Sequence, residues 1–454
     1  MIAVLTPAEM AAVDAAAPES VEVLIERAGA AVAATALAML GGGYGRRVVV
    51  LAGKGNNGAD GRSAAVRLRR RGVRVQVVDA AAAPERLPPA DLVVDAAYGT
   101  GFRGSYEAPA SAGAPVLAVD IPSGVDGLTG RAGGRVLAAT RTLTLAALKP
   151  GLLLPPGRAL AGEVVVADIG LTTTSPTGVV EGSDVRDWLP RRASETHKWM
   201  AAVLVVAGSP GMGGAAHLAA AAAQRAGAGM VRVASPGGAH EAAAPVEAVG
   251  LVLPAEDWAA GVLDGLERCH ALVIGPGLGT AVATQEAISA VLAAATVPVV
   301  VDGDGLRAVG RAAGGIVRTR TAGTVLTPHD GEYERLTGER PGADRVAAAR
   351  SLAAAAGAVV LLKGSTTVVA DPGGLVRIIT NGDARLATAG TGDVLSGIIG
   401  ALLARGLAPL EAAAAGAWLH GCAATLATAP GFVARDLIAT LPGALGLVST
   451  AGEV

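Results

Sequence analysis

Short runs of valine and leucine recur along the whole chain, and they restrict the fold more than any other feature of the sequence. Helix-like stretches separate the runs of the first third, which lie at 48–51, 73–78, 92–95, 116–120, 142–148 and 164–169. An uninterrupted β-branched run is typical of a strand that is buried on both faces of a parallel sheet. Strands that alternate with helices predict an open α/β sheet.

A second series of the same kind follows. Its runs lie at 203–209, 231–234, 271–275, 297–302, 324–327 and 358–364, and two more at 366–371 and 376–380 predict a hairpin. The stretch 172–182, TTTSPTGVVEG, separates the two series and is short and polar, with proline and glycine, as linkers often are. We therefore predict an α/β protein of two α/β/α domains, 1–182 and 183–454.

The stretch 387–406, ATAGTGDVLSGIIGALLARG, predicts a glycine-rich turn followed by a buried helix. The first amides of a helix have no partner within it, so the turn at 390–392 is a natural anion site. Asp393 is unexpected there, because a bound phosphate repels a carboxylate and raises its pKa. Such a group is a candidate proton acceptor. The alternative is that Asp393 only caps the helix.

Polar loops follow the strands of the first domain, at 53–61, 95–105, 119–127 and 148–151. The carboxyl ends of parallel strands meet at one edge, where ligands bind. We therefore expect the following side chains to converge: Asn56, Asn57, Asp60, Asp95, Asp120 and Ser123. Asn57, Asp95 and Ser123 offer hard oxygen ligands with one formal charge, which suits a monovalent cation. Asp120 ends a buried strand and must be paired or protonated, which favours it as acid or base; alternatively, these aspartates only bind loop amides.

Charge and cysteine content limit the class of partner. The chain has 37 basic and 39 acidic residues and a net charge of −2, so electrostatics favour neither nucleic acid nor an anionic membrane. Cys269 and Cys422 are far apart, which favours a reducing compartment. The first residues lack a signal-peptide pattern and predict a helix capped by Thr6. We expect a cytoplasmic protein in which the uncharged stretch 412–434 is a core helix.

Motifs of the first half carry a specific resemblance. LTPAEMAAVD, LIERAG, NNGADG, DAAYGTG, VDIPSGVDG and KPG occur in this order within 5–171. The stretch resembles the Rossmann-like epimerase domain of the NAD(P)H-hydrate repair proteins, although Ala59 replaces a glycine of the family pattern NNGGDG. The resemblance implies a catalytic Asp120 and a K⁺ site at Asn57, Asp95 and Ser123. It implies that the hydrate contacts Asn56, Asn57, Gly58, Ala59, Asp60, Gly99, Thr100, Gly101, Phe102, Arg103, Gly104, Ser105 and Asp120.

Motifs of the second half resemble the ribokinase-like dehydratase domain of the same proteins. They lie within 195–445 and are HKWMAAVLVVAGSPGMGGAA, GPGLG, VDGDGL, TPHDGE, LKGSTT and ATAGTGDVLSG. The resemblance implies a catalytic Asp393 and hydrate contacts at Ala215, Gly277, His329 and Asp393. It implies that ADP or ATP, accompanied by Mg²⁺, binds at Lys363, Gly364, Ser365, Thr366, Thr367, Gly390, Thr391 and Gly392. The chain departs from the family at DGDGL (302–306, for DADAL) and at Asp383, where the family has asparagine.

The resemblance implies a bifunctional repair enzyme. One domain would interconvert the R and S epimers of NAD(P)H hydrate, and the other would dehydrate the S form at the expense of ADP or ATP. One alternative is a small-alcohol kinase of the ribokinase type, with the first domain as an accessory. Another makes the first domain a ligand-sensing or RNA-binding scaffold. We expect the hydrates and an adenine nucleotide as partners, no nucleic acid, no membrane, and a homo-oligomer.

Several further residues have two interpretations. Asp302 and Asp304 either help to place magnesium or only stabilise a turn. The arginine run at 67–71 is expected to be a solvated helix face, with a contact to an extra cofactor phosphate as the alternative. Four histidines are expected to be structural: His217, His240, His270 and His420.

Overall fold

The computed structural model describes the 454 residues except 192–194, 239–243, 311–312, 429 and 450–454. The chain divides into two compact units between Thr177 and Gly178, and Met1 belongs to the second unit. The stretch at 172–182 is not wholly irregular, because it contains the strand β8 (Thr177–Val179). The apolar run at β8 is so short that the sequence alone does not distinguish this strand from a linker.

The amino-terminal unit contains a sheet whose neighbouring strands are all parallel, in the order β3-β2-β4-β5-β6-β7. The strands of this sheet are β2 (Arg47–Ala52), β3 (Arg74–Asp79), β4 (Leu92–Ala96), β5 (Val116–Val119), β6 (Arg141–Leu145) and β7 (Glu163–Ala167). The short strand β1 (Ile2–Ala3) precedes them in the chain and is not part of this sheet. The helices of the unit are α1 (Pro7–Ala15), α2 (Val21–Leu40), α3 (Asn56–Arg70), α4 (Pro150–Leu153) and α5 (Gly157–Ala161). The predicted strands, the parallel sheet and the Thr6 cap of α1 are confirmed.

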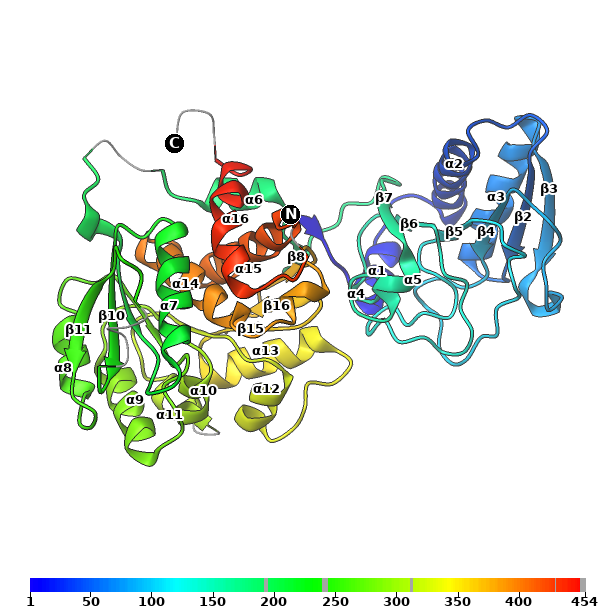
Figure 1. The fold of residues 1–454 in the computed structure, drawn as a ribbon. Coiled ribbons are helices and arrows are strands. Elements are labelled where there is room, and N and C mark those ends of the chain that lie inside the picture. The colour runs from blue at the N-terminus through cyan, green and yellow to red at the C-terminus, as the bar shows by residue number, and fades with distance from the viewer. Residues whose placement is uncertain (192–194, 239–243, 311–312, 429, 450–454) are drawn as a thin grey trace. The chain divides into compact units, whose positions relative to one another are not determined.

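Helices α2 and α3 pack on each other and on one face of this sheet (Figure 1). The two helices approach closely, because a Cβ on Gly29 of α2 would lie 2.3 Å from Ser63 Oγ of α3. Irregular segments cover much of the opposite face and add Leu87, Tyr106 and Leu137 to its core. Among the described residues, α2 alone has the length and apolar composition of a membrane-spanning helix. Its packing against α3 and the sheet accounts for the apolar residues on its buried face.

The carboxyl-terminal unit contains a larger sheet with the order β8-β17-β16-β15-β14-β13-β12-β9-β10-β11. Its strands after β8 are β9 (Ala202–Val206), β10 (Met230–Pro236), β11 (Val249–Leu253), β12 (Ala271–Ile274), β13 (Val299–Val301), β14 (Thr324–Leu326), β15 (Val359–Leu362), β16 (Thr367–Ala370) and β17 (Val376–Ile379). Neighbours from β11 to β15 are parallel, and β16 and β17 form the predicted antiparallel hairpin. Strand β11 was not predicted, because most of its residues are exposed or half-buried.

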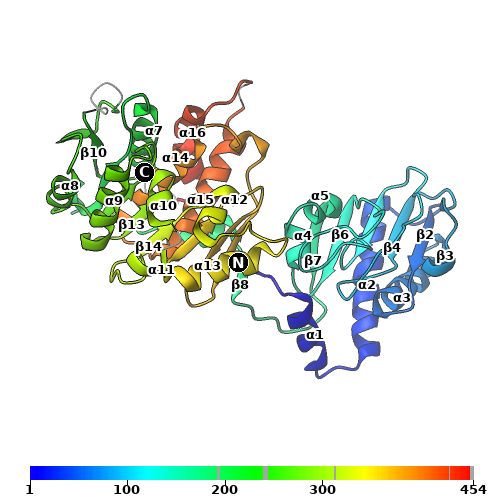
Figure 2. The ribbon, with the colours of Figure 1, turned by 90° about the horizontal axis from the view of Figure 1, so that it is seen from below.

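Helices cover both faces of this sheet (Figures 1 and 2). Five helices form a single core cluster with one face of the sheet: α6 (Gly182–Trp188), α7 (Gly213–Arg225), α14 (Thr391–Ala404), α15 (Pro409–Leu426) and α16 (Ala434–Gly446). The remaining helices are α8 (Ala259–Gly265), α9 (Val282–Ala294), α10 (Asp304–Val309), α11 (Ala313–Ile316), α12 (Asp330–Thr337) and α13 (Arg345–Ala356). Helix α15 is buried almost throughout, so the core helix predicted within 412–434 is confirmed.

Candidate active sites

The amino-terminal cavity lies where the strand order of the first sheet reverses. Strands β2 and β4 are neighbours, but the chain leaves them toward opposite edges of the sheet, and ligands bind in the crevice outside the carboxyl ends of such a pair. Gly53 follows β2, and a Cβ on Gly53 would lie only 1.9 Å from the carbonyl oxygen of Ala97, which follows β4. Glycine is therefore required here, and it allows the two polar loops to meet.

This cavity has a volume of about 480 Å³ and is closed on one side by α1 and α2. The predicted hydrate contacts that line it are Asn56, Asn57, Asp60, Gly99, Thr100, Gly101, Phe102 and Asp120. Gly58, Ala59, Arg103, Gly104 and Ser105 are not among its lining residues. Gly58 instead packs on the loop after β2, since its Cβ would lie 1.9 Å from the carbonyl oxygen of Gly53. The helical start of α3 thus presents one face of NNGADG to the cavity.

Asp120 directly follows β5 and has a left-handed backbone, with φ of 68°. Its Oδ1 atom lies 2.5 Å from Nζ of Lys149, and its Oδ2 atom accepts hydrogen bonds from the amide and hydroxyl of Thr100. Lys149 is 1% exposed and also donates to Thr144 Oγ1 and the carbonyl of Leu145. Burial alone would raise the pKa of Asp120, but Lys149 and Thr100 outweigh it and hold that pKa below its usual value. Asp120 is therefore a paired, ionised carboxylate at the cavity wall.

Two other carboxyl groups line the same cavity. Asp60 is 5% exposed, and burial, with the charges of Asp120 and Asp14, raises its pKa to about 8. Burial also raises the pKa of Asp14, against the attraction of Lys149. At neutral pH the cavity thus holds a protonated carboxyl group at Asp60 and an ionised one at Asp120.

The polar groups proposed for a cation lie beside this cavity. Ser123 donates its amide and hydroxyl to Asp95, at 2.9 and 2.7 Å, and both side chains are buried. Burial raises the pKa of Asp95, although these hydrogen bonds oppose the shift. Both side-chain polar atoms of Asn57 are buried without a partner among the described residues. An unpartnered amide oxygen, a buried carboxylate and a hydroxyl are the hard oxygen ligands that suit a monovalent cation.

The second site also lies where a strand order reverses, between β9 and β12 of the larger sheet. The amide of Gly208, after β9, donates to the carbonyl of Pro276, after β12. A Cβ on Gly277 would lie 2.9 Å from that of Ala215, at the start of α7. These two predicted hydrate contacts are therefore neighbours.

Lys363, which is partly buried, and Asp302, which is buried, form an ion pair at the ends of β15 and β13. Nζ of Lys363 lies 2.5 Å from Oδ1 of Asp302, which also accepts from Thr327, while Ser396 of α14 donates to Oδ2 at 2.7 Å. Burial opposes ionisation of both partners, but their mutual attraction lowers the pKa of Asp302 and raises that of Lys363. Gly392 lies beside the pair, because its Cβ would be 3.4 Å from Nζ of Lys363. The lysine thus reaches the anion turn.

Asp393 is the third residue of α14, and the N-cap residue is Gly390, with φ of 87°. Asp393 is therefore not the cap residue. Burial, followed by the charge of Asp302, raises the pKa of Asp393 to about 6, and Lys363 limits the shift. The amino-terminal amides of α14, an ammonium group and a carboxyl group that titrates near neutrality thus lie together. Such an arrangement can hold a phosphate and accept a proton from a neighbouring hydroxyl group.

Two histidines support these loops. His329 caps α12: its Nδ1 accepts from the amides of Gly331 and Glu332, and its side chain is 56% exposed. His420 lies 2.9 Å from the carbonyl of Thr391 through Nε2, and burial lowers its pKa to about 4. A neutral His420 therefore donates to the anion turn, as expected of a structural residue. His240 lies outside the described residues.

Three aspartates of this unit have local partners: Asp383, which departs from the family pattern, and Asp302 and Asp304, which match it. Asp383 pairs with Arg385, which holds the pKa of Asp383 below its usual value. Asp304 accepts from the amide of Gly279 at 2.8 Å, so it stabilises a loop. Asp302 has its oxygens committed to Lys363, Thr327 and Ser396, and its observed role is to hold the lysine.

The arginine run lies at the carboxyl end of α3, where Arg67 pairs with Glu26 and Arg69 donates to the carbonyl of Val75. Asn56 begins the same helix, and a helix of this length spans roughly 20 Å. The run is therefore a solvated helix face, remote from the cavity.

The sequence analysis did not identify Lys149 as a functional residue. Lys149 lies within an otherwise apolar stretch, ALKPGLLL. This position could have indicated a functional role, because a buried ammonium group needs a partner.

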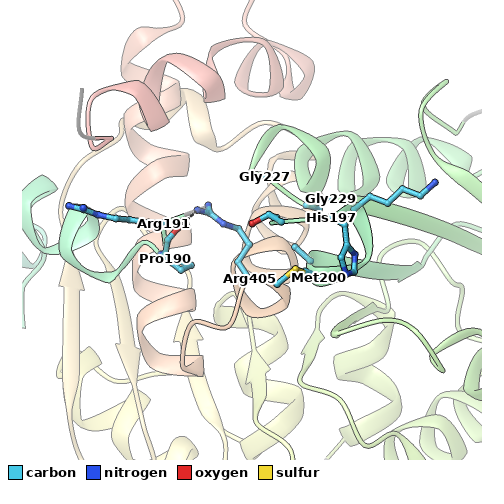
Figure 3. Close-up of a pocket in the computed structure, with 11 residues that line it drawn as sticks. Pro190, Arg191, His197, Met200, Gly227, Gly229 and Arg405 are labelled. Carbon is cyan, nitrogen blue, oxygen red and sulfur yellow. Dashed lines mark hydrogen bonds between the residues drawn. The ribbon is translucent and has the colours of Figure 1, made fainter. Parts of the chain in front are cut away.

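A second cavity, of about 370 Å³, opens at the amino ends of β9 and β10 and is partly lined by basic residues (Figure 3). Arg405, at the end of α14, donates to the carbonyl of Pro190 at 2.9 Å and to that of Ala226, after α7, at 3.4 Å. Carbonyls at helix carboxyl ends carry partial negative charge, which Arg405 complements. The arginine therefore joins two helix ends and Pro190.

The fold and the two sites define a two-domain α/β enzyme in which both sites lie at strand-order reversals, and one site combines the first amides of a helix with an ammonium group. Family models agree: one described as NAD(P)H-hydrate dehydratase matches 203–442, and one described as YjeF-related protein N-terminus matches 21–88 and 78–151. Bifunctional NAD(P)H-hydrate repair enzymes from Moorella thermoacetica and Mycobacterium tuberculosis are 38% and 43% identical to this chain. The first alignment covers 87% of each chain, and the second covers 83% of this chain and 82% of the relative. The chain belongs to this family of bifunctional repair enzymes.

The carboxyl-terminal unit is also similar to solved structures. The ADP/ATP-dependent NAD(P)H-hydrate dehydratase of Bacillus subtilis, co-crystallised with ATP and Mg²⁺, is 32% identical with a TM-score of 0.52. The alignment covers 59% of this chain and 98% of the Bacillus chain. A ribokinase-like protein of Enterococcus faecalis is 24% identical, with a TM-score of 0.54, and shares the fold. This alignment covers 61% of this chain and 98% of the Enterococcus chain. The predicted ribokinase-like fold is confirmed.

Proposed function

We propose that the amino-terminal unit epimerises NAD(P)H hydrate and that the carboxyl-terminal unit dehydrates the S epimer at the expense of ADP or ATP. The observation that carries the proposal is Asp393, a carboxyl group with a pKa of about 6 beside Lys363 and the first amides of α14. A kinase-like phosphate site does not need a proton acceptor with a raised pKa merely to bind a nucleotide. A hydroxyl group that must be activated as a nucleophile does need one.

In the epimerase, the C6–O bond of the hydrate breaks as the ring nitrogen forms a double bond to C6, and water then adds to the other face. Asp60, protonated at neutral pH, donates a proton to the leaving hydroxyl group. Asp120, kept ionised by Lys149, accepts a proton from the incoming water. Asn57, Asp95 and Ser123 would hold K⁺, whose positive charge attracts the phosphates of the dinucleotide.

In the dehydratase, Lys363 and the amides of Gly392 and Asp393 hold the terminal phosphate of the nucleotide. Asp393 takes the proton of the C6 hydroxyl group, whose oxygen then bonds to the terminal phosphorus as the bond from that phosphorus to the nucleotide breaks, which releases AMP from ADP or ADP from ATP. The C6–O bond then breaks, phosphate leaves, and loss of a C5 proton to water restores the ring double bond.

Magnesium would bind mainly through the nucleotide phosphates. Mg²⁺ usually keeps several waters and binds to one or two carboxylates together with substrate phosphates. The described residues contain no cluster of three or more His, Cys, Asp or Glu side chains that could hold a metal, which accords with a metal that arrives with its nucleotide. The bound ion neutralises charge on the phosphates.

The test is an assay of a mixture of both NADH-hydrate epimers with ADP or ATP, followed by the absorbance of reduced nicotinamide. Complete recovery supports both activities, and recovery of half shows that the first unit is silent. A phosphorylated product that is never converted to NADH supports the small-alcohol kinase instead. No change in the hydrates, whichever nucleotide is present, contradicts the proposal.

Location and assembly rest on the sequence alone. We propose a cytoplasmic homo-oligomer, and light scattering of the purified chain measures its assembly state.

A further inference from the structure

Arg345 connects the two loops assigned to the nucleotide and the hydrate. It is the first residue of α13, and its side chain is 16% exposed. One guanidinium nitrogen, Nη2, donates to the carbonyl of Lys363 at 2.7 Å, and the other, Nη1, lies 2.9 Å from Oδ1 of Asp330. Lys363 follows β15, while Asp330 follows His329 after β14. A single side chain thus spans two adjacent loops of the proposed active site.

The position of Arg345 is not explained by the stability of its helix. The amino end of a helix carries partial positive charge, so a cation in the first turn is placed against the helix dipole. Its Nε atom is also buried without a partner among the described residues. These unfavourable features indicate that the guanidinium is held for the two contacts that it makes.

The chain around Arg345 is arranged to receive it. A Cβ on Gly364 would lie 2.9 Å from Nη2 of Arg345, so the missing side chain lets the guanidinium lie against the backbone. The amide of Lys363 donates to the carbonyl of Pro328 at 2.9 Å, which joins the same two loops a second time. A lysine at 345 would lack the planar fork that reaches both acceptors at once.

We propose that Arg345 is a positioning residue that couples nucleotide binding to hydrate binding. This inference rests on the proposed function and extends it. Fixing the carbonyl of Lys363 sets the origin of the side chain that reaches Asp302 and Gly392. Asp330 is the first residue of α12, so fixing it orients the loop after β14 that ends at His329. Either ligand therefore orders a loop that the other also uses, and by linkage each tightens the binding of the other by the same factor.

The test measures the dissociation constant of a nucleotide analogue that cannot transfer its terminal phosphoryl group. Calorimetry gives this constant with and without saturating hydrate, for the natural full chain and its variants. Arg345→Met should weaken nucleotide binding by about tenfold to a hundredfold, the usual cost of hydrogen bonds to a charged group, and should abolish the coupling. Asp330→Asn should lose the coupling and keep nucleotide affinity within about threefold, because the bond to the Lys363 carbonyl remains. Arg340→Met is the matched control, since Arg340 pairs with Glu334 on the exposed face.

Dehydratase kinetics provide a second readout: Arg345→Met should raise the nucleotide KM more than it lowers kcat. Thermal unfolding of each variant reports whether the carboxyl-terminal unit, which contains Arg345 and Asp330, is folded. Unchanged affinity and coupling in Arg345→Met would overturn the inference, and so would full coupling in Asp330→Asn. If Arg345→Met does not fold, Asp330→Asn and Arg345→Lys decide, since both should lose coupling. A wild-type chain that binds nucleotide but leaves the hydrate unchanged contradicts the proposed function and leaves the nucleotide arm of this test valid.

Discussion

In the amino-terminal unit the more deeply buried partner of the central ion pair is a lysine, whereas in the carboxyl-terminal unit it is an aspartate. Lys149 is 1% exposed and Asp120 is 13% exposed; Lys363 is 21% exposed and Asp302 is 4% exposed. Both pairs join Nζ to Oδ1 at 2.5 Å. The first pair therefore presents a carboxylate to its ligand, and the second presents an ammonium group.

The difference shows how one ion pair serves two chemistries. A carboxylate fixed by a buried lysine stays ionised and can accept a proton. An ammonium group fixed by a buried aspartate stays charged and can hold a phosphate. In the second unit a separate carboxyl group, Asp393, must then serve as the base, and its raised pKa agrees with that role.

The largest effect is expected at that separate base. Asp393→Asn should lower the dehydratase kcat by about 10²–10⁴-fold, the usual contribution of a general base. Nucleotide affinity and epimerase activity should change little, because Lys363 and Asp120 remain. Steady-state kinetics and nucleotide titration check this, and strong residual dehydratase activity would remove Asp393 from the mechanism.

Removing the buried lysine of the first pair should impair one activity only. Lys149→Met leaves Asp120 in place without its cation, so burial should raise the pKa of Asp120 and epimerase activity should fall about a hundredfold at neutral pH. Activity should partly return as the pH rises and Asp120 ionises. Unfolding should cost about 3–5 kcal/mol less, as for a broken buried pair. A pH–rate profile and chemical denaturation measure both effects, and an unchanged profile would separate Lys149 from Asp120.

The corresponding change in the second pair should act on binding. Lys363→Met should raise the nucleotide KM about tenfold to a hundredfold and lower kcat less, because the proton acceptor is intact. The expected contrast with Lys149→Met is a change in KM in one unit and in kcat in the other. If Lys149→Met and Lys363→Met both changed only kcat, the two ion pairs would not differ in function as we propose.

The pH dependence of the dehydratase should follow Asp393. With a pKa of about 6, the carboxyl group is ionised above that pH and can accept a proton, so kcat should fall about tenfold for each pH unit below it. A pH–rate profile of the S epimer with saturating nucleotide measures this slope. A rate that stays level well below pH 6 would contradict it.

The smallest effect is expected at a departure from the family pattern. Ala59 lies within α3 and does not line the cavity. Ala59→Gly should therefore leave epimerase activity within about twofold and destabilise the unit by about 0.8–1 kcal/mol through the lower helix propensity of glycine. Thermal unfolding and initial rates test this, and a large gain in activity would show that the methyl group obstructs the ligand.

Most strands and the polar loops of both units could be predicted from sequence patterns, because buried strands are continuous apolar runs and the carboxyl ends of parallel strands gather ligands. Strands β8 and β11 could not, since β8 is short and β11 is largely exposed. The pairings across the sites could not be predicted either. Lys149 is separated from Asp120 by 29 residues and Lys363 from Asp302 by 61, and no local pattern identifies the partner of a buried charge. Arg345 was missed for the same reason, since its two contacts depend on how β14 and β15 lie side by side.

The central claim is that two separate bases, Asp120 and Asp393, act in sequence on one substrate pool. The most direct measurement is the recovery of reduced-nicotinamide absorbance from an equal mixture of R and S NADH hydrate with ADP or ATP. The account predicts complete recovery by the natural chain, a fast half followed only by the slow spontaneous rate with Asp120→Asn, and no nucleotide-dependent recovery with Asp393→Asn. Complete recovery at the natural rate by either variant would contradict it.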